Sequence, residues 1–399
     1  MNPRDDAVPN TTDGEIHDVD RSTDGEIRDV DRSTLAPLVQ RALNSGTAQI
    51  DRWACQPVHR GYGGAHLYRV SGTARDRAHS RPWSLFLKIV RPVENFGDTE
   101  SWIREVRAYQ SGFLEDLPGG LAAPRCFAVV ERSPDEFWIW LEDVKDCIGD
   151  EWPAQRYGLA ARHLGQFNGA YLAGCPMPTY SWLSRNWLRR FIAPYAALMD
   201  RLQQPSLPPL LRRACPPGVT PALLQFWSER ERFLHALEQV PQTICHLDAF
   251  RGNLFACDDP HGTAKTIAID WSFVGSGAIG EELAPLIVMF RVAQDLQAEK
   301  APDISELVFQ GYREGLGDAG WHGDPRLVQL GFVIAASLRY GLMWPNVALH
   351  WSQLDEQQRA QAERSFGVTL EQGADLIAAT IPRTLQLVER ARSLIDALW

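Results

Sequence analysis

Three side chains that can bind a metal ion or accept a proton lie close together in residues 243–275. Asp248 lies in a polar loop after a short apolar run, Asn253 precedes a second run, and Asp270 lies where a third run ends. A loop aspartate can orient an attacking hydroxyl and take its proton, while an amide oxygen and a second carboxylate hold Mg²⁺ against nucleotide phosphates. The residue types and their order therefore favour phosphoryl transfer.

A short strand and a hairpin are the elements expected to position these residues. Residues 254–257 and 266–269 are apolar runs of strand length, and the turn-forming segment DDPHG lies between them. They predict a β-hairpin, and Asp270 follows its second arm directly. A surface hairpin in which Asp and Asn only form turns is the alternative, but it leaves the features upstream without an explanation.

A glycine-rich segment and a strand lysine precede this region. Gly61, Gly63 and Gly64 lie between two strand-like runs, where the lack of a Cβ lets backbone N–H groups approach phosphates. Glycine-rich hairpins also occur for structural reasons alone. In the next strand, residues 84–90, alternation places Lys88 on one face with two apolar side chains, which is also typical of an edge lysine that reaches water.

A helix and two more strands are expected before the chain becomes mainly helical. The helix would be capped by Asp98 or Thr99, with Glu105 next to its apolar stripe. Residues 125–131 and 136–142 predict strands joined by a turn. Further helices, the last broken or kinked at Pro382, are predicted over residues 155–173, 220–240, 304–317, 325–344 and 369–397.

The segments HLDAFRGN and IDW, which contain the two aspartates and the asparagine, resemble the catalytic loop and metal-binding segment of the aminoglycoside phosphotransferase and choline kinase branch of the protein-kinase-like superfamily. The resemblance extends over residues 50–295. It implies an α+β, protein-kinase-like two-lobed fold, with a small antiparallel β lobe carrying one helix and a large, mainly helical lobe. It also implies ATP and Mg²⁺ as cofactors, and transfer of the γ-phosphoryl group to a hydroxyl of an aminoglycoside-like, amino alcohol or sugar acceptor.

The resemblance gives each candidate catalytic and metal-binding residue a role. Asp248 would orient and deprotonate the acceptor hydroxyl, while Asn253 and Asp270 would bind magnesium. The position two after Asp248, often a histidine in the family, is Phe250 in this chain. We hypothesise that Arg251 supplies the missing positive charge near the transferred phosphoryl group.

Two further departures from the family pattern follow the IDW segment. Ser272 stands where the family often has an acidic residue, so an acidic function there is absent or shifted. Glu282 occupies the place of a customary aspartate, and we expect it to support the catalytic loop.

For the nucleotide, the resemblance implies contacts from the upstream half of the chain. The three glycines would approach the phosphates, Lys88 would hold the α- and β-phosphates, and Glu105 would pair with Lys88. The strand at residues 136–142 would lead into a hinge against which adenine lies, with contacts from backbone groups of Glu142 and Val144.

Charge and cysteine content argue against several other classes of protein. The first 34 residues carry ten acidic residues and four arginines, so they account for −6 of the net charge of −10 and leave the rest nearly balanced. A balanced surface argues against a nucleic-acid or anionic-membrane partner. Seven cysteines without a C-x-x-C pair suggest neither a zinc site nor a disulfide framework. No uncharged apolar run has the length of a membrane span, and the polar N-terminus makes the cytoplasm the expected location.

Three regions are predicted along the chain. Residues 1–34 form an acidic tail in which TDGEIHDVDRS is followed by TDGEIRDVDRS, and so polar a repeat is expected to be disordered. Residues 35–142 would form the nucleotide-binding lobe, beginning with a helix capped by Ser33 or Thr34. Residues 143–399 would form the helical lobe with the catalytic and acceptor-binding residues. The sequence leaves the oligomeric state open.

Two functions from other classes stay open. One is a catalytically silent nucleotide-binding or scaffold protein of the same fold, and the other is a metal-dependent phosphoester hydrolase that uses His246, Asp248 and Asp270. The acceptor, the preference for ATP or GTP, and a role in antibiotic resistance or in metabolism are also open. Carboxylates or aromatic rings would bind a cationic acceptor, and the candidates are Glu229, Glu231, Asp295, Glu299, Trp344 and Trp351.

Overall fold

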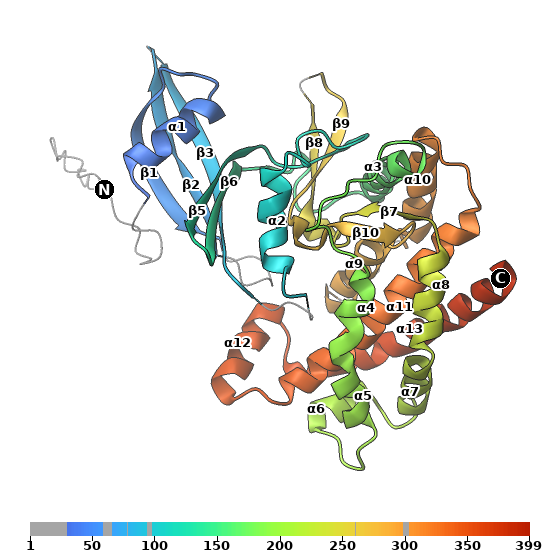
Figure 1. Cartoon of the computed structure of the whole chain (residues 1–399). Helices are drawn as coiled ribbons and strands as arrows, with labels where there is room; N and C mark the ends of the chain where they lie inside the picture. Colours follow the sequence, from blue (N-terminus) through green and yellow to red (C-terminus); the bar gives the residue numbers. More distant parts are fainter. Residues whose placement is uncertain (1–29, 59–65, 78, 94–97, 260, 298–302) are drawn as a thin grey trace, which may run out of the picture. The chain divides into compact units, whose positions relative to one another are not determined.

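The structure is a computed structural model that describes residues 30–58, 66–77, 79–93, 98–259, 261–297 and 303–399, without the side chains of 293–297. Most of the acidic repeat and the glycines Gly61, Gly63 and Gly64 lie outside these residues. The chain divides into two compact units (Figure 1): a first unit up to Ile89 with Cys126–Val130 and Trp138–Asp143, and a second of Val90–Arg125, Glu131–Phe137 and Val144–Trp399. The limits of the three predicted regions stay a prediction.

A five-stranded sheet in the order β1-β2-β3-β6-β5 forms most of the first unit. The pairs β1–β2 and β2–β3 are antiparallel, and a tight turn joins β5 to β6. Strand β6 has the predicted bounds, whereas β3 begins earlier than predicted. The strands are β1 (Gln49–Pro57), β2 (His66–Asp76), β3 (His79–Val90), β5 (Cys126–Ser133) and β6 (Glu136–Glu142).

Alternation along β3 buries one face of the sheet, as the sequence predicts. Leu85, Leu87 and Ile89 are fully buried in the core of the first unit. Lys88 is half-buried on the opposite face. The face of the sheet that carries Lys88 is therefore less buried than the face that packs into the core of the first unit.

Helix α1 (Arg32–Ala42) contributes to this core and begins earlier than predicted. Asp31, and not Ser33 or Thr34, is the N-cap, because its carboxylate accepts a hydrogen bond from the amide of Thr34 at 2.8 Å. The Ser33 hydroxyl donates to the same oxygen at 2.8 Å. Ser33 and Thr34, the predicted caps, therefore follow Asp31, whose carboxylate caps the helix instead.

The second unit is mainly helical and contains two small sheets. One pairs β7 (Gln242–Cys245) with β10 (Gly275–Ala278), and the other has the order β4 (Leu121–Ala122), β9 (Ala264–Ala268) and β8 (Leu254–Asp258). The predicted β8–β9 hairpin is confirmed. Residues 275–278 form β10, which is antiparallel to β7. Glycine is needed there because a Cβ on Gly275 would lie 2.2 Å from the carbonyl oxygen of Ser184.

Two long helices of the second unit each contain an internal proline. Helix α11 (Pro325–Trp351) continues through Pro345, and α13 (Leu370–Leu398) continues through Pro382. A break at Pro382 is therefore wrong, and a kink there stays a prediction. Each proline removes one helix hydrogen bond, but packing of the buried helix faces outweighs that loss. Conversely, the helix predicted over residues 220–240 is interrupted at Glu229.

The remaining helices of the second unit are short or of ordinary length, and α3 begins and ends within a residue of its predicted bounds. They are α2 (Ser101–Gln110), α3 (Ala154–Leu172), α4 (Trp187–Ile192), α5 (Ala196–Leu202), α6 (Pro209–Ala214), α7 (Thr220–Ser228), α8 (Arg230–Gln239), α9 (Leu283–Gln297), α10 (Ser305–Asp318) and α12 (Glu356–Phe366).

Helix α3 packs on α10 and holds the strand that leads to Asp248. A Cβ on Gly165 would lie 2.2 Å from the carbonyl oxygen of Tyr312, so the close crossing of the two helices requires glycine. From α3, the buried amide of Asn168 donates to the carbonyl of Ile244 on β7 at 2.7 Å. The strand before Asp248 is therefore fixed to α3 as well as to β10.

Helix α11 is the one helix in the described chain whose length and composition would suffice for a membrane span. However, 78% of the residues in its most apolar window are buried inside the protein. It packs against α4, α6, α8, α9 and α13. We interpret it as a core helix of the second unit.

Candidate functional site

The β8–β9 hairpin places Asn253 and Asp270 at the same end. Leu254 on β8 pairs with Ala268 on β9, and one step further the amide of Ile269 donates to the carbonyl of Asn253 at 2.9 Å. Asp270 follows immediately. The register of the hairpin thus brings the two predicted metal ligands together.

Asp248 is joined to the same group through Asn253. The side-chain nitrogen of Asn253 donates to the backbone oxygen and to Oδ2 of Asp248, both at 3.0 Å. Because the nitrogen is used in this way, the side-chain oxygen is the atom that Asn253 can offer to a cation. Asn253 is 7% exposed, and the side chain of Asp248 is 15% exposed.

His246 connects the predicted catalytic loop, residues 246–253, to the strand end that carries Asp270. Its Nδ1 accepts from the amide of Asp248 at 3.2 Å, and its Nε2 donates to the carbonyl of Ile269 at 2.9 Å. The ring packs edge-on against Trp271, with centroids 4.5 Å apart. Burial lowers the pKa of His246, so the ring is neutral and both nitrogens are engaged within the protein.

Two residues of this site adopt left-handed backbone conformations. Leu247 has φ of 67° and Asp270 has φ of 61°, and neither is glycine. A bulky residue in this region is strained and persists only where the surroundings hold it. In this site the hairpin and the hydrogen bonds of His246 hold the two residues in these conformations. The strained backbone therefore fixes the positions of the neighbouring side chains.

Glu282 supports the catalytic loop, as predicted. Its carboxylate accepts hydrogen bonds from the amides of His246 and Leu247, the latter at 3.3 Å. Burial raises the pKa of Glu282 to about 8, against the opposing effect of these two amides. Glu282 therefore fixes the backbone just before Asp248 from a fully buried position.

The neighbouring Glu281 is also buried and lines a cavity of about 540 Å³ together with Trp187, Gln242 and Ser276. Its carboxylate accepts from the amide of Ala278 at 3.0 Å. Burial nevertheless raises its pKa from 4.5 to about 7. At neutral pH this carboxyl is therefore partly protonated in the folded protein.

Replacing Glu281 with glutamine should flatten the dependence of stability on pH. Since the folded pKa lies above the unfolded one, the stability that Glu281 contributes is fully present below pH 4.5 and is lost as pH rises through 7. Between pH 5 and 7 wild type should lose about 1–2 kcal/mol relative to Glu281→Gln. Urea unfolding at both pH values measures this difference, and parallel curves for the two proteins would contradict it.

Arg339 on α11 lies against the loop that carries Asp248. Its Nη2 is 2.6 Å from Oδ1 of Asp248, and its Nη1 donates to the carbonyl of Leu247 at 2.7 Å. The Arg339 side chain is 7% exposed. Together with the bond from Asn253, this contact engages both carboxylate oxygens of Asp248.

Arg251 lies in a different network, formed with the loop that follows β6. Its guanidinium donates to the carbonyls of Leu254 at 2.8 Å and Gly149 at 2.7 Å. It also pairs with Asp146 at 3.2 Å and stacks on Trp152 at 4.3 Å. These contacts give the guanidinium a structural function, and the catalytic charge that the sequence suggests for it stays a prediction.

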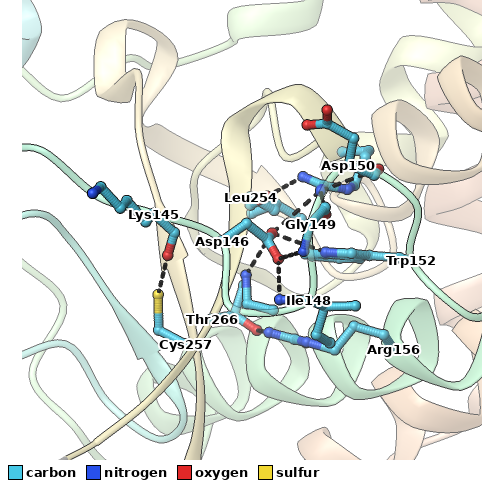
Figure 2. Close-up of polar contacts among 12 residues, drawn as sticks. Lys145, Asp146, Ile148, Gly149, Asp150, Trp152, Arg156, Leu254, Cys257 and Thr266 are labelled. Carbon is cyan, nitrogen blue, oxygen red and sulfur yellow. Dashed lines mark hydrogen bonds and ion pairs between the residues drawn. The ribbon is translucent and has the colours of Figure 1, made fainter. Parts of the chain in front are cut away.

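Asp146 is the centre of this loop network (Figure 2). It accepts hydrogen bonds from the amides of Ile148 at 2.9 Å, Gly149 at 3.0 Å and Ala256 at 3.0 Å, and from the indole of Trp152 at 2.9 Å. Burial opposes ionisation, but these donors hold the pKa of Asp146 below its ordinary value. The network fastens the loop to β8, next to Asn253.

Replacing Arg251 with alanine should lower stability by about 2 kcal/mol, because two carbonyls and a carboxylate lose a charged donor. Urea unfolding measures the loss. Arg232→Ala is the matched control, since that exposed ion pair with Asp396 should contribute less than about 0.5 kcal/mol. The kcat of the folded Arg251→Ala variant decides the catalytic hypothesis: an unchanged kcat excludes it, and a loss of tenfold or more supports it.

The other predicted nucleotide residues are divided between the two units. Lys88 lies on β3 in the first unit, and Glu142 ends β6 there, whereas Val144 begins the next segment of the second unit. Glu105 on α2 belongs to the second unit, where its Oε1 accepts from the amide of Trp271 at 3.3 Å. The predicted pairing of Lys88 with Glu105 stays a prediction.

The acidic candidates for a cationic acceptor are paired with arginines where they are described. Glu229 accepts two hydrogen bonds from Arg392 at 2.9 Å, and Glu231 pairs with Arg189 at 2.5 Å. The side chain of Asp295 and the whole of Glu299 lie outside the described residues. Neither described carboxylate is therefore an unpaired acidic group.

The two tryptophan candidates differ in burial. Trp351 is 7% exposed and packs edge-on against Phe366, with centroids 5.3 Å apart, so it belongs to the core. Trp344 is half-buried on α11.

Two arginines that the sequence reasoning missed hold the site together. Arg339 contacts Asp248, and Arg104, 1% exposed, bonds the carbonyl of Ser272 at 2.5 Å and pairs with Asp98 at 2.8 Å. Asp98 was expected only as a helix cap. A signal was present, because Arg339 is a lone charge within the apolar segment LGFVIAASLRYGLMW, and a buried charge requires a partner.

Comparison with known proteins gives one family and many similar folds. The model of the family described as the phosphotransferase enzyme family matches residues 56–322. A choline kinase from Cryptosporidium parvum is 11% identical, with a TM-score of 0.51 over 87% of this chain and 93% of its own. A search of curated proteins finds no match.

Two further solved structures are less similar. A Plasmodium vivax ethanolamine kinase is 11% identical, with a TM-score of 0.49 over 84% of this chain and 83% of its own. An amicoumacin kinase in complex with AMP-PNP, Ca²⁺ and Ami is 12% identical, with a TM-score of 0.47 over 86% and 92%. At such identities the likeness concerns the fold, an α+β kinase-like architecture with an antiparallel sheet and a larger helical part.

Proposed function

Because the chain belongs to the phosphotransferase enzyme family, we propose that it transfers the γ-phosphoryl group of ATP to a hydroxyl group of a small molecule. The observation that carries this proposal is the grouping of Asp248, Asn253 and Asp270 by the hairpin register and by the Asn253–Asp248 hydrogen bonds. These three side chains are the parts that phosphoryl transfer requires on the acceptor and metal sides.

The donor set fits a magnesium ion. Asn253 can offer a side-chain oxygen and Asp270 a carboxylate, and Mg²⁺ in phosphoryl-transfer sites is held by one or two such oxygen ligands together with substrate phosphates. When bound, the ion would neutralise negative charge on the phosphate groups. The strained backbone of Asp270 and the bonds of Asn253 keep both ligands in place for it.

Asp248 would receive the acceptor hydroxyl. Each carboxylate oxygen can accept more than one hydrogen bond, so a hydroxyl can donate to Asp248 while Arg339 and Asn253 stay in contact. The carboxylate would then direct the hydroxyl oxygen toward the γ-phosphorus and take its proton as the new O–P bond forms. The bond from the γ-phosphorus to the bridging oxygen breaks, and that oxygen leaves with ADP. Glu282 and His246 hold the loop backbone in position for this step.

The residues that the sequence predicts for nucleotide binding would hold ATP. Gly61, Gly63 and Gly64 would approach the phosphates, and Lys88 would hold the α- and β-phosphates. Backbone groups of Glu142 and Val144 would contact the base. For Glu105, the bond to the Trp271 amide supports a further function, which is to position the segment that carries Asp270.

The two alternative functions have less support. A metal-dependent hydrolase would use His246 as a ligand, but both of its ring nitrogens already form hydrogen bonds within the protein. Among the described residues there is also no group of three or more His, Cys, Asp or Glu placed to hold a metal ion. A silent scaffold would not require Asp248 to be held by two neighbouring side chains.

An acceptor screen tests the proposed function. Purified protein is incubated with Mg²⁺ and ATP and with aminoglycosides, macrolides, amino alcohols, sugars and nucleosides, and ADP formation is followed. We expect ADP formation that depends on one acceptor class and a phosphorylated product detected by mass spectrometry. ATP consumption that is independent of every acceptor, with release of inorganic phosphate, would support a hydrolase instead.

A further inference from the structure

Arg339 brings a permanent positive charge to the carboxylate that would receive the acceptor. The guanidinium lies 2.6 Å from Asp248 and is anchored by the Leu247 carbonyl at 2.7 Å. Arginine stays protonated in proteins, so the pair has no net charge. The attraction that a lone aspartate would exert on a cationic acceptor is therefore largely cancelled.

Three aromatic rings surround the same guanidinium. Its carbon lies 4.7 Å from the ring centroid of Trp187, 5.3 Å from that of Phe191 and 5.0 Å from that of Tyr340. Rings at such distances form a favourable site for a cation. In this chain the cation that fills the site is Arg339 itself, so a quaternary or primary ammonium group of an acceptor has no place there.

The other ionisable groups near Arg339 do not restore a negative charge. Tyr195 and Tyr340 are buried phenols whose pKa is raised by burial, so they are neutral. Burial raises the pKa of Glu281 to about 7 and that of Glu282 to about 8, so at neutral pH Glu281 is about half protonated and Glu282 mostly protonated. Apart from Asp270, which would bind the metal ion, these described groups therefore add little negative charge near Asp248.

We propose that Arg339 determines the class of acceptor, and that the natural acceptor is a neutral polyhydroxyl compound, such as a sugar or nucleoside, and not a cationic aminoglycoside or amino alcohol. This inference rests on the proposed function, since it concerns the acceptor of the same reaction. It agrees with the pairing of Glu229 and Glu231 with arginines, which removes two other carboxylates that would attract a cation.

Electrostatics sets the size of the expected effect. A second cation at about 6–8 Å from Arg339 in surroundings of effective dielectric constant about 20 is disfavoured about 30- to 100-fold. In wild type this repulsion offsets the attraction of Asp248, so the kcat/KM for the best neutral acceptor should be no lower than that for the best cationic acceptor. The probes are glucose, myo-inositol and uridine against kanamycin, choline and ethanolamine, with Mg·ATP saturating.

Variants of Arg339 test whether this residue is responsible. In Arg339→Gln the ratio of neutral to cationic kcat/KM should fall by about 30-fold, whereas Arg339→Lys, which keeps the charge, should retain the wild-type order. Arg232→Gln, which removes an exposed arginine ion-paired with Asp396, is the matched control and should leave the ratio unchanged. Circular dichroism confirms that each variant is folded.

A binding experiment examines the aromatic rings without turnover. Tetramethylammonium should raise the melting temperature of Arg339→Ala, where the ring site is vacated, and should leave that of wild type unchanged. Equal stabilisation of both proteins, or of neither, would overturn the claim that Arg339 occupies a cation site.

The acceptor ranking separates failure of this inference from failure of the proposed function. If wild type phosphorylates kanamycin or choline more efficiently than every neutral acceptor, the proposed function stands and the role of Arg339 is wrong. If the protein neither binds Mg·ATP nor phosphorylates any probe, the proposed function is wrong and the inference falls with it.

Discussion

Replacing Asp270 with alanine is expected to abolish the Mg²⁺-dependent part of ATP binding, weakening the affinity by about 100-fold or more, because the ion loses its carboxylate ligand. Isothermal titration with AMP-PNP, with and without Mg²⁺, measures this change. Asp258→Ala is the matched control, since Asp258 ends β8 in the same hairpin and is exposed. Tight Mg·AMP-PNP binding by Asp270→Ala would count heavily against the proposed metal site.

The large effect of Asp270 follows from its place in the hairpin. It directly follows Ile269, whose amide is bonded to Asn253, and its backbone is held at φ of 61°. No flexible segment lies between the two proposed ligands and the paired strands. Asn253→Ala should therefore weaken binding in the same direction but less, since a neutral oxygen contributes less than a carboxylate.

Replacing Asp248 with asparagine is expected to lower kcat by about 10²–10⁴-fold, because a positioned proton acceptor is lost. The Kd for Mg·ATP should change by less than about threefold, because in the proposed reaction Asp248 would contact the acceptor and not the metal. Steady-state kinetics with the acceptor found in the screen, together with titration calorimetry, measures both quantities.

The same substitution also tests how Asp248 is held. Arg339 would lose its charged partner at 2.6 Å, while the bond to the Leu247 carbonyl would remain. A double variant with Arg339→Gln should therefore show a kcat no lower than Asp248→Asn alone. Equal loss of nucleotide binding and kcat in Asp248→Asn would indicate misfolding of the loop and would contradict the assigned role.

Much of the fold could be predicted from the sequence because the signals are local. Strand β6 has the predicted bounds, and the β8–β9 hairpin forms where apolar runs flank a turn segment. The proximity of Asn253 and Asp270 is a consequence of that hairpin. The local sequence pattern predicts an element correctly where the alternation of apolar residues and the turn-forming residues indicate the same structure.

The parts that could not be predicted depend on contacts between distant segments. Arg339 lies 91 positions after Asp248 and meets it only because α11 packs beside the catalytic loop. Arg251, in the same loop as Asp248, bonds a loop about a hundred positions away. Pro382 fails to end α13 because packing of a long buried face outweighs one lost hydrogen bond.

The most direct test of the central claim is ³¹P NMR of wild-type protein incubated with Mg·ATP and the responding acceptor. The account predicts that the γ-phosphate resonance is replaced by that of a phosphomonoester on the acceptor, and that Asp248→Asn forms this product at least about 100-fold more slowly. Conversion of the γ-phosphate to inorganic phosphate alone, or an unchanged ATP spectrum with every acceptor class, would contradict it.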